Sequence, residues 1–166
     1  MCHTEAMPDL LAHQQQYPGK WQPKAGPDGK ASFWLPIWVQ VERQPDLGLD
    51  GQGNWVVPTG DGLIPAQLRP VLLLPLLHLE RDAFEMQLSA RLKALKLPVL
   101  PLVESLVLLT LKAGLSSRSD FWEEHVLKWL RPQNITEELL GLVLHLKEHG
   151  RTQNIRHQAL HFLKQF

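Results

Sequence analysis

The chain has 166 residues, of which 44% are hydrophobic and 20% are charged. This length and composition are typical of a globular domain that buries a continuous apolar core. The 17 lysines and arginines balance the 17 aspartates and glutamates, so no overall charge draws the molecule to nucleic acid or to an anionic membrane. Binding to either would require a local patch.

The single cysteine, Cys2, excludes an internal disulfide framework and a cysteine-based zinc site. The first residues lack the basic start and the apolar stretch of a secretory signal. The longest apolar stretch, residues 97 to 111, contains two prolines and a glutamate and is too short to cross a bilayer. We therefore expect a cytoplasmic protein that does not bind a membrane.

The sequence changes character near residue 70. Residues 1 to 70 contain most of the prolines and glycines and four of the six tryptophans, whereas leucine with helical periodicity dominates residues 71 to 166. This pattern predicts an N-terminal β and loop section followed by a helical body, packed together as one compact domain. The expected fold class is α+β.

The clearest strand is predicted over residues 32 to 43, where apolar residues alternate on one face and tryptophans mark the other. A hairpin loop over 46 to 53 leads to a short antiparallel strand at 54 to 57. A Gly-Pro-Asp-Gly turn marks 20 to 30 as a loop, and prolines and glycines mark 58 to 70 as an irregular connection. Two or three antiparallel strands are therefore expected.

The helical body is expected to contain about five helices between residues 79 and 166, in addition to a short helix at 8 to 16. The first spans 79 to 95, and the second spans 101 to 112. The second is apolar around most of its circumference and is therefore placed at the centre of the body. The other three are expected to begin at capping residues: Ser119, Asn134 or Thr136, and Thr152 or Asn154.

The last two predicted helices meet at Gly150 in a helix-turn-helix arrangement. The second opens with side chains that can hydrogen-bond to base edges, namely Gln153, Asn154, Arg156 and His157. However, Arg151 occupies a position where the turn normally buries an apolar residue. A plain helical hairpin with a basic face explains the same pattern, so nucleic-acid binding by these four residues is the alternative function.

Tryptophans provide a second candidate surface. Alternation along the predicted strand places Trp34 and Trp38 on one face, with Trp21 and Trp55 on flanking segments. An open shelf of these rings could stack nucleobases or hold an extended peptide. Because large aromatic side chains are mostly buried, the other interpretation is that the helical body covers this face.

Histidines recur at i, i+4 spacing in the last two predicted helices, at positions 145, 149, 157 and 161. Each pair lies on one helical face, and the four imidazoles could bind zinc if the two faces met. Neither pair carries the glutamate of the H-E-x-x-H motif. We interpret these histidines as solvated and expect neither a metal site nor a cofactor.

Catalytic motifs are absent from the sequence. It contains no G-x-S-x-G, no glycine-rich phosphate loop, and no cysteine and histidine placed for nucleophilic attack. Carboxylates such as Asp120 and Glu123 fall in predicted first helical turns, where they favour the helix dipole and are expected to be solvated. We therefore expect no catalytic residue and no enzymatic activity.

The segment FWLPIWVQV, followed by a glycine-rich turn and LIPAQLRP, resembles N-terminal segments of large helicase-type ATPases. The likeness covers a minor part of the chain and includes no functional motif, so it implies no activity. The surplus of apolar surface, above all around residues 101 to 112, predicts a non-catalytic protein-interaction or adaptor module. Its expected partner is another protein or further domains of the same polypeptide, within a larger multi-component machine.

Overall fold

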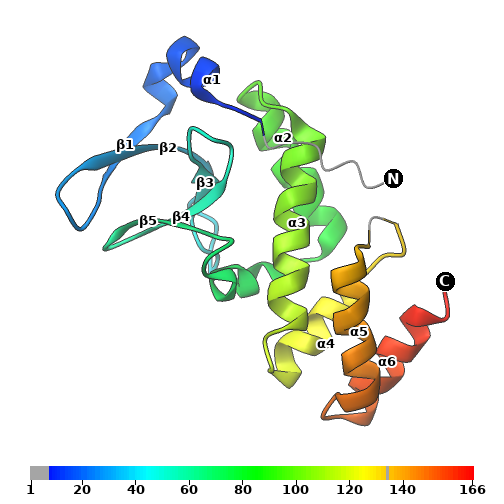
Figure 1. Ribbon diagram of the computed structural model, residues 1–166. Coiled ribbons are helices and arrows are strands. Elements are labelled where there is room, and N and C mark those ends of the chain that lie inside the picture. The colour runs from blue at the N-terminus through cyan, green and yellow to red at the C-terminus, as the bar shows by residue number, and fades with distance from the viewer. Residues whose placement is uncertain (1–7, 134) are drawn as a thin grey trace.

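The computed structural model describes residues 8 to 133 and 135 to 166 (Figure 1). A curved antiparallel sheet lies on one side of the molecule and a group of helices on the other, which confirms the α+β class. The expected counts differ from those of the described residues, which contain five strands, six α-helices and two 3₁₀ helices. Cys2 and Asn134 lie outside the described residues.

The sheet is a meander in which each strand pairs antiparallel with the next in the chain. The order is β1-β2-β3-β4-β5, and the sheet curls so that β1 also contacts β5. The strands are β1 (Gln22–Ala25), β2 (Ala31–Trp38), β3 (Leu47–Leu49), β4 (Trp55–Thr59) and β5 (Gly62–Pro65).

Three strands occupy segments that were predicted as loops. β1 has the sequence QPKA and carries no alternating apolar signal, while β3 is only three residues long. β5 follows β4 after two residues and ends in a proline. Short strands are specified by pairing with their neighbours more than by their own pattern, which explains why the expected two or three strands are too few.

The helices of the body follow the predicted order and are five in the described residues after position 80. The hydroxyls of Ser119, Thr136 and Thr152 accept hydrogen bonds from backbone N–H groups in the first turns of the last three helices, as expected of N-caps. The helices are α2 (Arg81–Ala94), α3 (Val99–Leu115), α4 (Asp120–Trp129), α5 (Glu137–His149) and α6 (Gln153–Leu163).

A 3₁₀ helix of nine residues, η2 (Pro70–His78), connects the sheet to α2. Runs of this length are uncommon in 3₁₀ geometry, but four leucines of η2 are buried, so tertiary packing holds the segment in place. These leucines are Leu73, Leu74, Leu76 and Leu77.

The N-terminal helix α1 (Leu11–Gln16) and the short 3₁₀ helix η1 (Pro18–Lys20) are attached to the body through one imidazole. The indole N–H of Trp21 donates to Nδ1 of His13 at 3.1 Å. Because Nδ1 accepts, Nε2 of His13 donates to the carbonyl oxygen of Leu95, 2.7 Å away. This relay joins the start of the described chain to the end of α2.

The apolar helix α3 lies at the centre of the body, as predicted (Figure 1). It contacts η2, α2, α4 and α5. The indole N–H of Trp55, on β4, donates to the carbonyl oxygen of Leu102 at 3.0 Å and to the hydroxyl of Ser105 at 3.1 Å. α3 is therefore tied to the sheet as well as to the other helices. None of the helices in the described residues is both long enough and apolar enough to cross a membrane.

A β-bulge at Ile37 interrupts the pairing of β2 with β3. Leu35 pairs with Leu49, and Trp38, three residues later, pairs with Leu47, so β2 uses one residue more than β3. Leu47 and Leu49 lie on the same face of β3 because side chains alternate along a strand. Their partners Leu35 and Trp38 therefore share that face.

The bulge separates Trp34 from Trp38. Without a bulge, the four-residue spacing would place both rings on one face, as the alternation predicts. With it, Trp34 lies on the opposite face, where it packs on Gly48 so closely that a Cβ atom there would come within 2.5 Å of the indole ring. The expectation of a shared face is thereby corrected.

Trp38 joins the sheet to α2. Its fully buried ring meets Phe84 edge-on, with ring centroids 5.0 Å apart, and the guanidinium carbon of Arg91 lies 4.7 Å from the indole centroid. Nη1 of Arg91 also donates to the carbonyl oxygen of Ile37 at 3.1 Å. One arginine thus contacts both the bulge and the ring behind it.

The indoles of Trp38 and Trp55, which both join the sheet to the helices, differ in hydrogen bonding, and this difference can be tested. Nε1 of Trp38 has no partner among the described residues, whereas Nε1 of Trp55 donates to α3. We expect Trp55→Phe to lower the free energy of unfolding by about 1 kcal/mol more than Trp38→Phe, since both lose similar volume but only one loses a hydrogen bond. Urea denaturation measures the difference, and equal losses would contradict this assignment.

Candidate functional site

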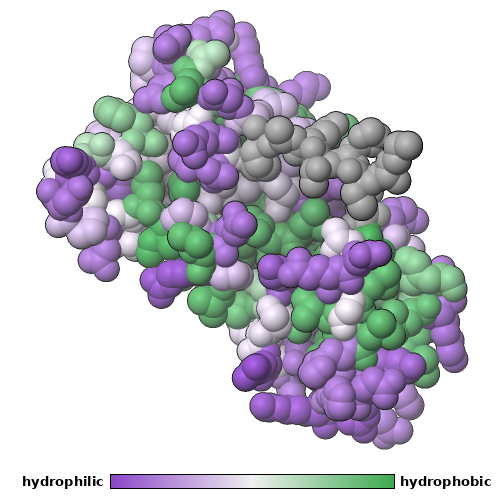
Figure 2. All heavy atoms as spheres, viewed as in Figure 1, coloured by the Kyte–Doolittle hydropathy of each residue, from purple (hydrophilic) through white to green (hydrophobic). Residues whose placement is uncertain are grey.

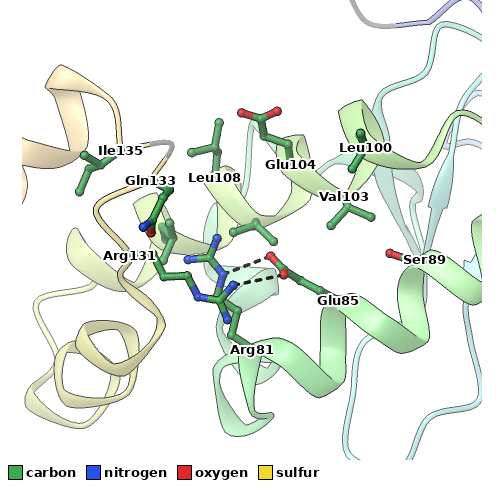
Figure 3. A pocket seen from close by; sticks show the side chains of 12 residues that line it. Arg81, Glu85, Ser89, Leu100, Val103, Glu104, Leu108, Arg131, Gln133 and Ile135 are labelled. Atoms are coloured by element: carbon green, nitrogen blue, oxygen red, sulfur yellow. Dashed lines mark hydrogen bonds and ion pairs between the residues drawn. The ribbon is translucent and has the colours of Figure 1, made fainter.

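A groove of about 550 Å³ lies between α2, α3 and the side chains of Arg131, Gln133 and Ile135, and we call it the α2–α3 groove (Figure 3). Its floor consists of apolar residues of α3. Those at positions 100, 103, 107 and 111 are spaced three or four positions apart and share one helical face, and Leu108 lies beside them. Leu100, at the end of the groove, is 80% exposed. The floor residues are Leu100, Val103, Val107, Leu108 and Leu111.

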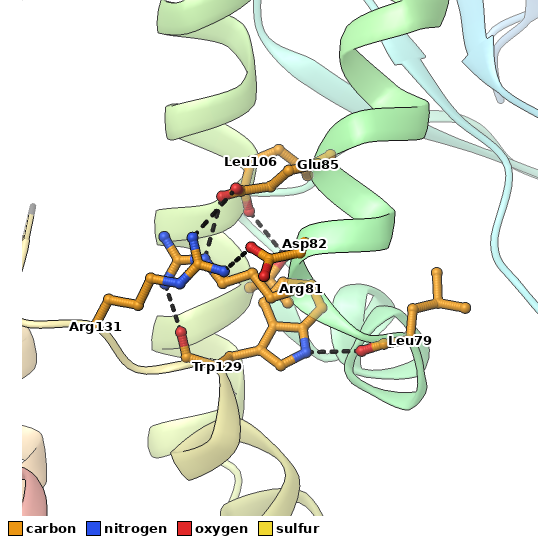
Figure 4. Close-up of polar contacts among 8 residues, drawn as sticks. Leu79, Arg81, Asp82, Glu85, Leu106, Trp129 and Arg131 are labelled. Carbon is orange, nitrogen blue, oxygen red and sulfur yellow. Dashed lines mark hydrogen bonds and ion pairs between the residues drawn. The ribbon is translucent and has the colours of Figure 1, made fainter.

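Charged side chains form one wall of this groove (Figure 4). Nε of Arg81 lies 3.1 Å from Oε1 of Glu85, and its Nη1 donates to the carbonyl oxygen of Trp129. Arg131 pairs with the carboxylate of Asp82 and, at 3.6 Å, with Oε2 of Glu85. These contacts link α2 to the end of α4, and each charge in the wall has an opposite charge beside it.

The ion pair between Arg81 and Glu85 is partly buried and therefore has a structural role. The side chain of Arg81 is only 10% exposed, and burial lowers the pKa of Arg81, while the hydrogen bond and charge of Glu85 raise it. An arginine stays protonated in proteins even when desolvated, so Glu85 compensates a permanent charge. The indole N–H of Trp129 donates to the carbonyl oxygen of Leu79 at 2.9 Å beside this network and closes the same corner.

The groove favours apolar contact over chemistry. The described residues that line it include neither histidine nor cysteine, and the one hydroxyl among them is that of Ser89. Glu104, on the rim, is exposed and forms no ion pair with any described residue. Such a site offers an aliphatic floor, a neutralised ionic wall and one unpaired carboxylate.

The residues predicted to read nucleic acid lie on α6, where Gln153, Asn154 and His157 are exposed. Arg156 is half-buried, and its Nη1 donates to the carbonyl oxygen of Gly150 at 2.6 Å. Oδ1 of Asn154 accepts a hydrogen bond from Gln158. The helical hairpin forms as expected, but the guanidinium of Arg156 binds the backbone of the turn between its two helices.

That turn requires glycine. A Cβ atom at Gly150 would lie 2.6 Å from the carbonyl oxygen of Leu146 and 2.8 Å from a methyl carbon of Ile155. The close approach brings α6 back along α5 immediately after the last turn of α5. Glycine is therefore needed at position 150 because neighbouring atoms leave no room for a Cβ. Its backbone conformation does not require glycine, since φ has an ordinary negative value of −55°.

The tryptophans proposed as a shelf are buried. Trp34 is 7% exposed and Trp38 is 0% exposed, and the two lie on opposite faces of the sheet. Trp21 and Trp55 are also buried. In this arrangement the rings present no open face on which a base or a peptide could stack.

The two histidine pairs lie on different helices and do not form one cluster. Within the described residues, no group of three or more histidine, cysteine, aspartate or glutamate side chains is placed to hold a metal ion. The rings of His145 and His149 are 4.8 Å apart on α5. His157 and His161 of α6 line a second groove against α4.

A buried carboxylate at the start of α4 corrects the expectation that the acids of this turn are solvated. Glu123 is 7% exposed, and neither its Oε2 nor Oδ1 of Asp120 has a hydrogen-bond partner among the described residues. Burial raises the pKa of Glu123, the charge of Asp120 raises it further, and the charge of Arg151 lowers it. The sequence shows the helix start but not the neighbour that covers the side chain.

The raised pKa of Glu123 predicts that its ionisation opposes folding. The folded pKa lies above the unfolded value of about 4.3, so stability falls as pH rises through these values. Glu123→Gln should therefore raise the urea midpoint at about pH 7, and the gain should disappear at about pH 3, where the glutamate is protonated in both states. Glu124→Gln is the control, and an equal gain in both variants would refute this assignment.

Comparison of the chain with models of protein families, with curated proteins and with solved structures found no match.

Proposed function

We propose that the chain is a non-catalytic protein-interaction module that binds a partner through the α2–α3 groove. The observation that carries the proposal is Leu100, which is 80% exposed at the end of a concave apolar floor. Figure 2 shows apolar surface over the middle of the molecule, where α3 lies in Figure 1. Concave apolar surface rimmed by polar groups is typical of protein-binding sites.

The pairing of the wall charges supports this proposal. The two cations, Arg81 and Arg131, are compensated by two anions, Asp82 and Glu85, so none of these groups needs a ligand charge and none is free to act on a substrate. Affinity would then come from covering the floor, as in grooves that bind an amphipathic helix. Glu104 adds a place for a basic residue of the partner.

In this proposal the partner is another protein or a further domain of the same polypeptide. The module would act as an adaptor, within a larger cytoplasmic assembly, by fixing the position of that partner. The nucleic-acid alternative ranks second, because the guanidinium of Arg156 is held by Gly150 and only part of the predicted recognition set faces solvent.

Two exposed apolar residues allow a matched test of the groove. Leu100 lies in the groove, whereas Met86, on α2, is 70% exposed and is not among its lining residues. Peptides selected for binding from a phage-displayed random library should bind Leu100→Lys about tenfold or more weakly than wild type and should bind Met86→Lys with unchanged affinity. Fluorescence anisotropy with labelled peptides measures both affinities.

The outcome of the selection also separates the two functions. Groove-binding peptides should show apolar residues at helical spacing, and their affinity should depend weakly on salt. Peptides that bind Leu100→Lys as tightly as wild type, or a selection that gives no binding peptide, would overturn the proposal. Steeply salt-dependent binding of a labelled DNA duplex would instead favour the nucleic-acid function.

A further inference from the structure

A second hollow, of about 390 Å³, lies between α4 and α6, and we call it the α4–α6 groove. Its floor is apolar and nearly covered, because Leu127 and Leu130 are each 9% exposed and Phe162 is 5% exposed. Three exposed basic side chains line it, namely Lys128 from α4 and His157 and His161 from α6.

The charges of this groove have one sign. Its lining contains no carboxylate among the described residues, and no aspartate or glutamate occurs in α6. Lys128 forms no ion pair with a described residue, although Glu124 lies one turn earlier on the same helix and outside the lining. α5, which also packs against α6, contributes no residue to this lining.

We propose that the α4–α6 groove binds an acidic amphipathic segment of a partner protein. An apolar side chain of that segment would rest on Leu127, Leu130 and Phe162, while its carboxylates would face Lys128, His157 and His161. Charge complementarity argues for this occupant, since a lining with cationic groups and no carboxylate attracts an anionic ligand and disfavours a basic one. This surface is distinct from the α2–α3 groove and has the opposite charge preference.

The lining favours a peptide over nucleic acid. Binding to a phosphate backbone needs several permanent cations, and this groove contains one, Lys128. A sugar-phosphate backbone also has no side chain that would cover an apolar floor of two leucines and a phenylalanine. An acidic peptide with leucine or phenylalanine residues satisfies both parts of the site.

The two histidines make the binding dependent on pH. Histidine changes its charge between about pH 5 and 8, and a bound carboxylate favours the charged imidazolium. Among the described residues that line the groove, the other charged group is Lys128. Affinity for an acidic peptide should therefore rise as the pH falls from about 8 to about 6.

Two histidine pairs of equal spacing provide a matched experiment. Peptides are selected from a phage-displayed random library on the wild-type protein at about pH 6, and labelled peptides are then titrated by fluorescence anisotropy. We expect aspartate and glutamate beside leucine or phenylalanine in the selected sequences. His157→Gln with His161→Gln should weaken binding about fivefold to tenfold, whereas His145→Gln with His149→Gln should leave it unchanged.

Further variants separate this site from the first. Lys128→Glu should lower the affinity for the acidic peptides further. Leu100→Lys should leave this affinity unchanged, so the test does not depend on the α2–α3 groove. The proposal is overturned if no acidic binder is selected, or if acidic binders bind equally well without His157 and His161. It is also overturned if a labelled DNA duplex, and no peptide, responds to the same substitutions.

Discussion

The fold is arranged around the need to cover α3, a helix that is apolar around most of its circumference. Nine of its residues are buried, and its neighbours are η2, α2, α4, α5 and the indole of Trp55 on the sheet. Each neighbour removes part of the apolar surface from water, which is the main favourable contribution to folding. Leu100, which is 80% exposed, is the apolar residue of α3 that the described residues leave most open, and it lies at the end of the α2–α3 groove.

The polar groups around α3 serve the same arrangement. The indole N–H groups of Trp55 and Trp129 donate to carbonyl oxygens of other elements. Each ring therefore contributes buried apolar area, and its hydrogen bond fixes the orientation of the ring. Arg81 bridges Glu85 and the carbonyl oxygen of Trp129 at the corner where α2 meets the end of α4. Because the two arginines of the wall are paired with Glu85 and Asp82, the wall limits the groove sterically and contributes little net charge.

The helical part of the fold could be predicted from the sequence because its signals are local. Capping hydroxyls at Ser119, Thr136 and Thr152 and the stop at Gly150 each act within one turn. The sheet could not be predicted to the same degree. Strands as short as β3 are defined by their partners. Pro36 indicates an edge strand or a bulge at this point of β2, but the alternation of apolar residues does not show that the bulge at Ile37 reverses the face of Trp38.

The candidate sites were predicted only in part. The apolar surplus of α3 was evident from the sequence, but the groove also needs Arg131 and Ile135, which reach it from the connection after α4. The histidines of α6 were evident as well, whereas their neighbour Lys128 belongs to another helix. Contacts between elements of this kind depend on packing angles, which no single segment of sequence specifies.

The central claim is that a partner binds the α2–α3 groove and covers Leu100, and site-specific photo-crosslinking tests it most directly. A photoreactive phenylalanine analogue is placed at position 100 or at position 86 of the full chain, in the cells that naturally contain the protein. The account predicts one discrete crosslinked product from position 100, either with a second protein or with a further domain of the same polypeptide, and none from position 86. Crosslinks of equal yield from both positions, or none from position 100, would contradict it.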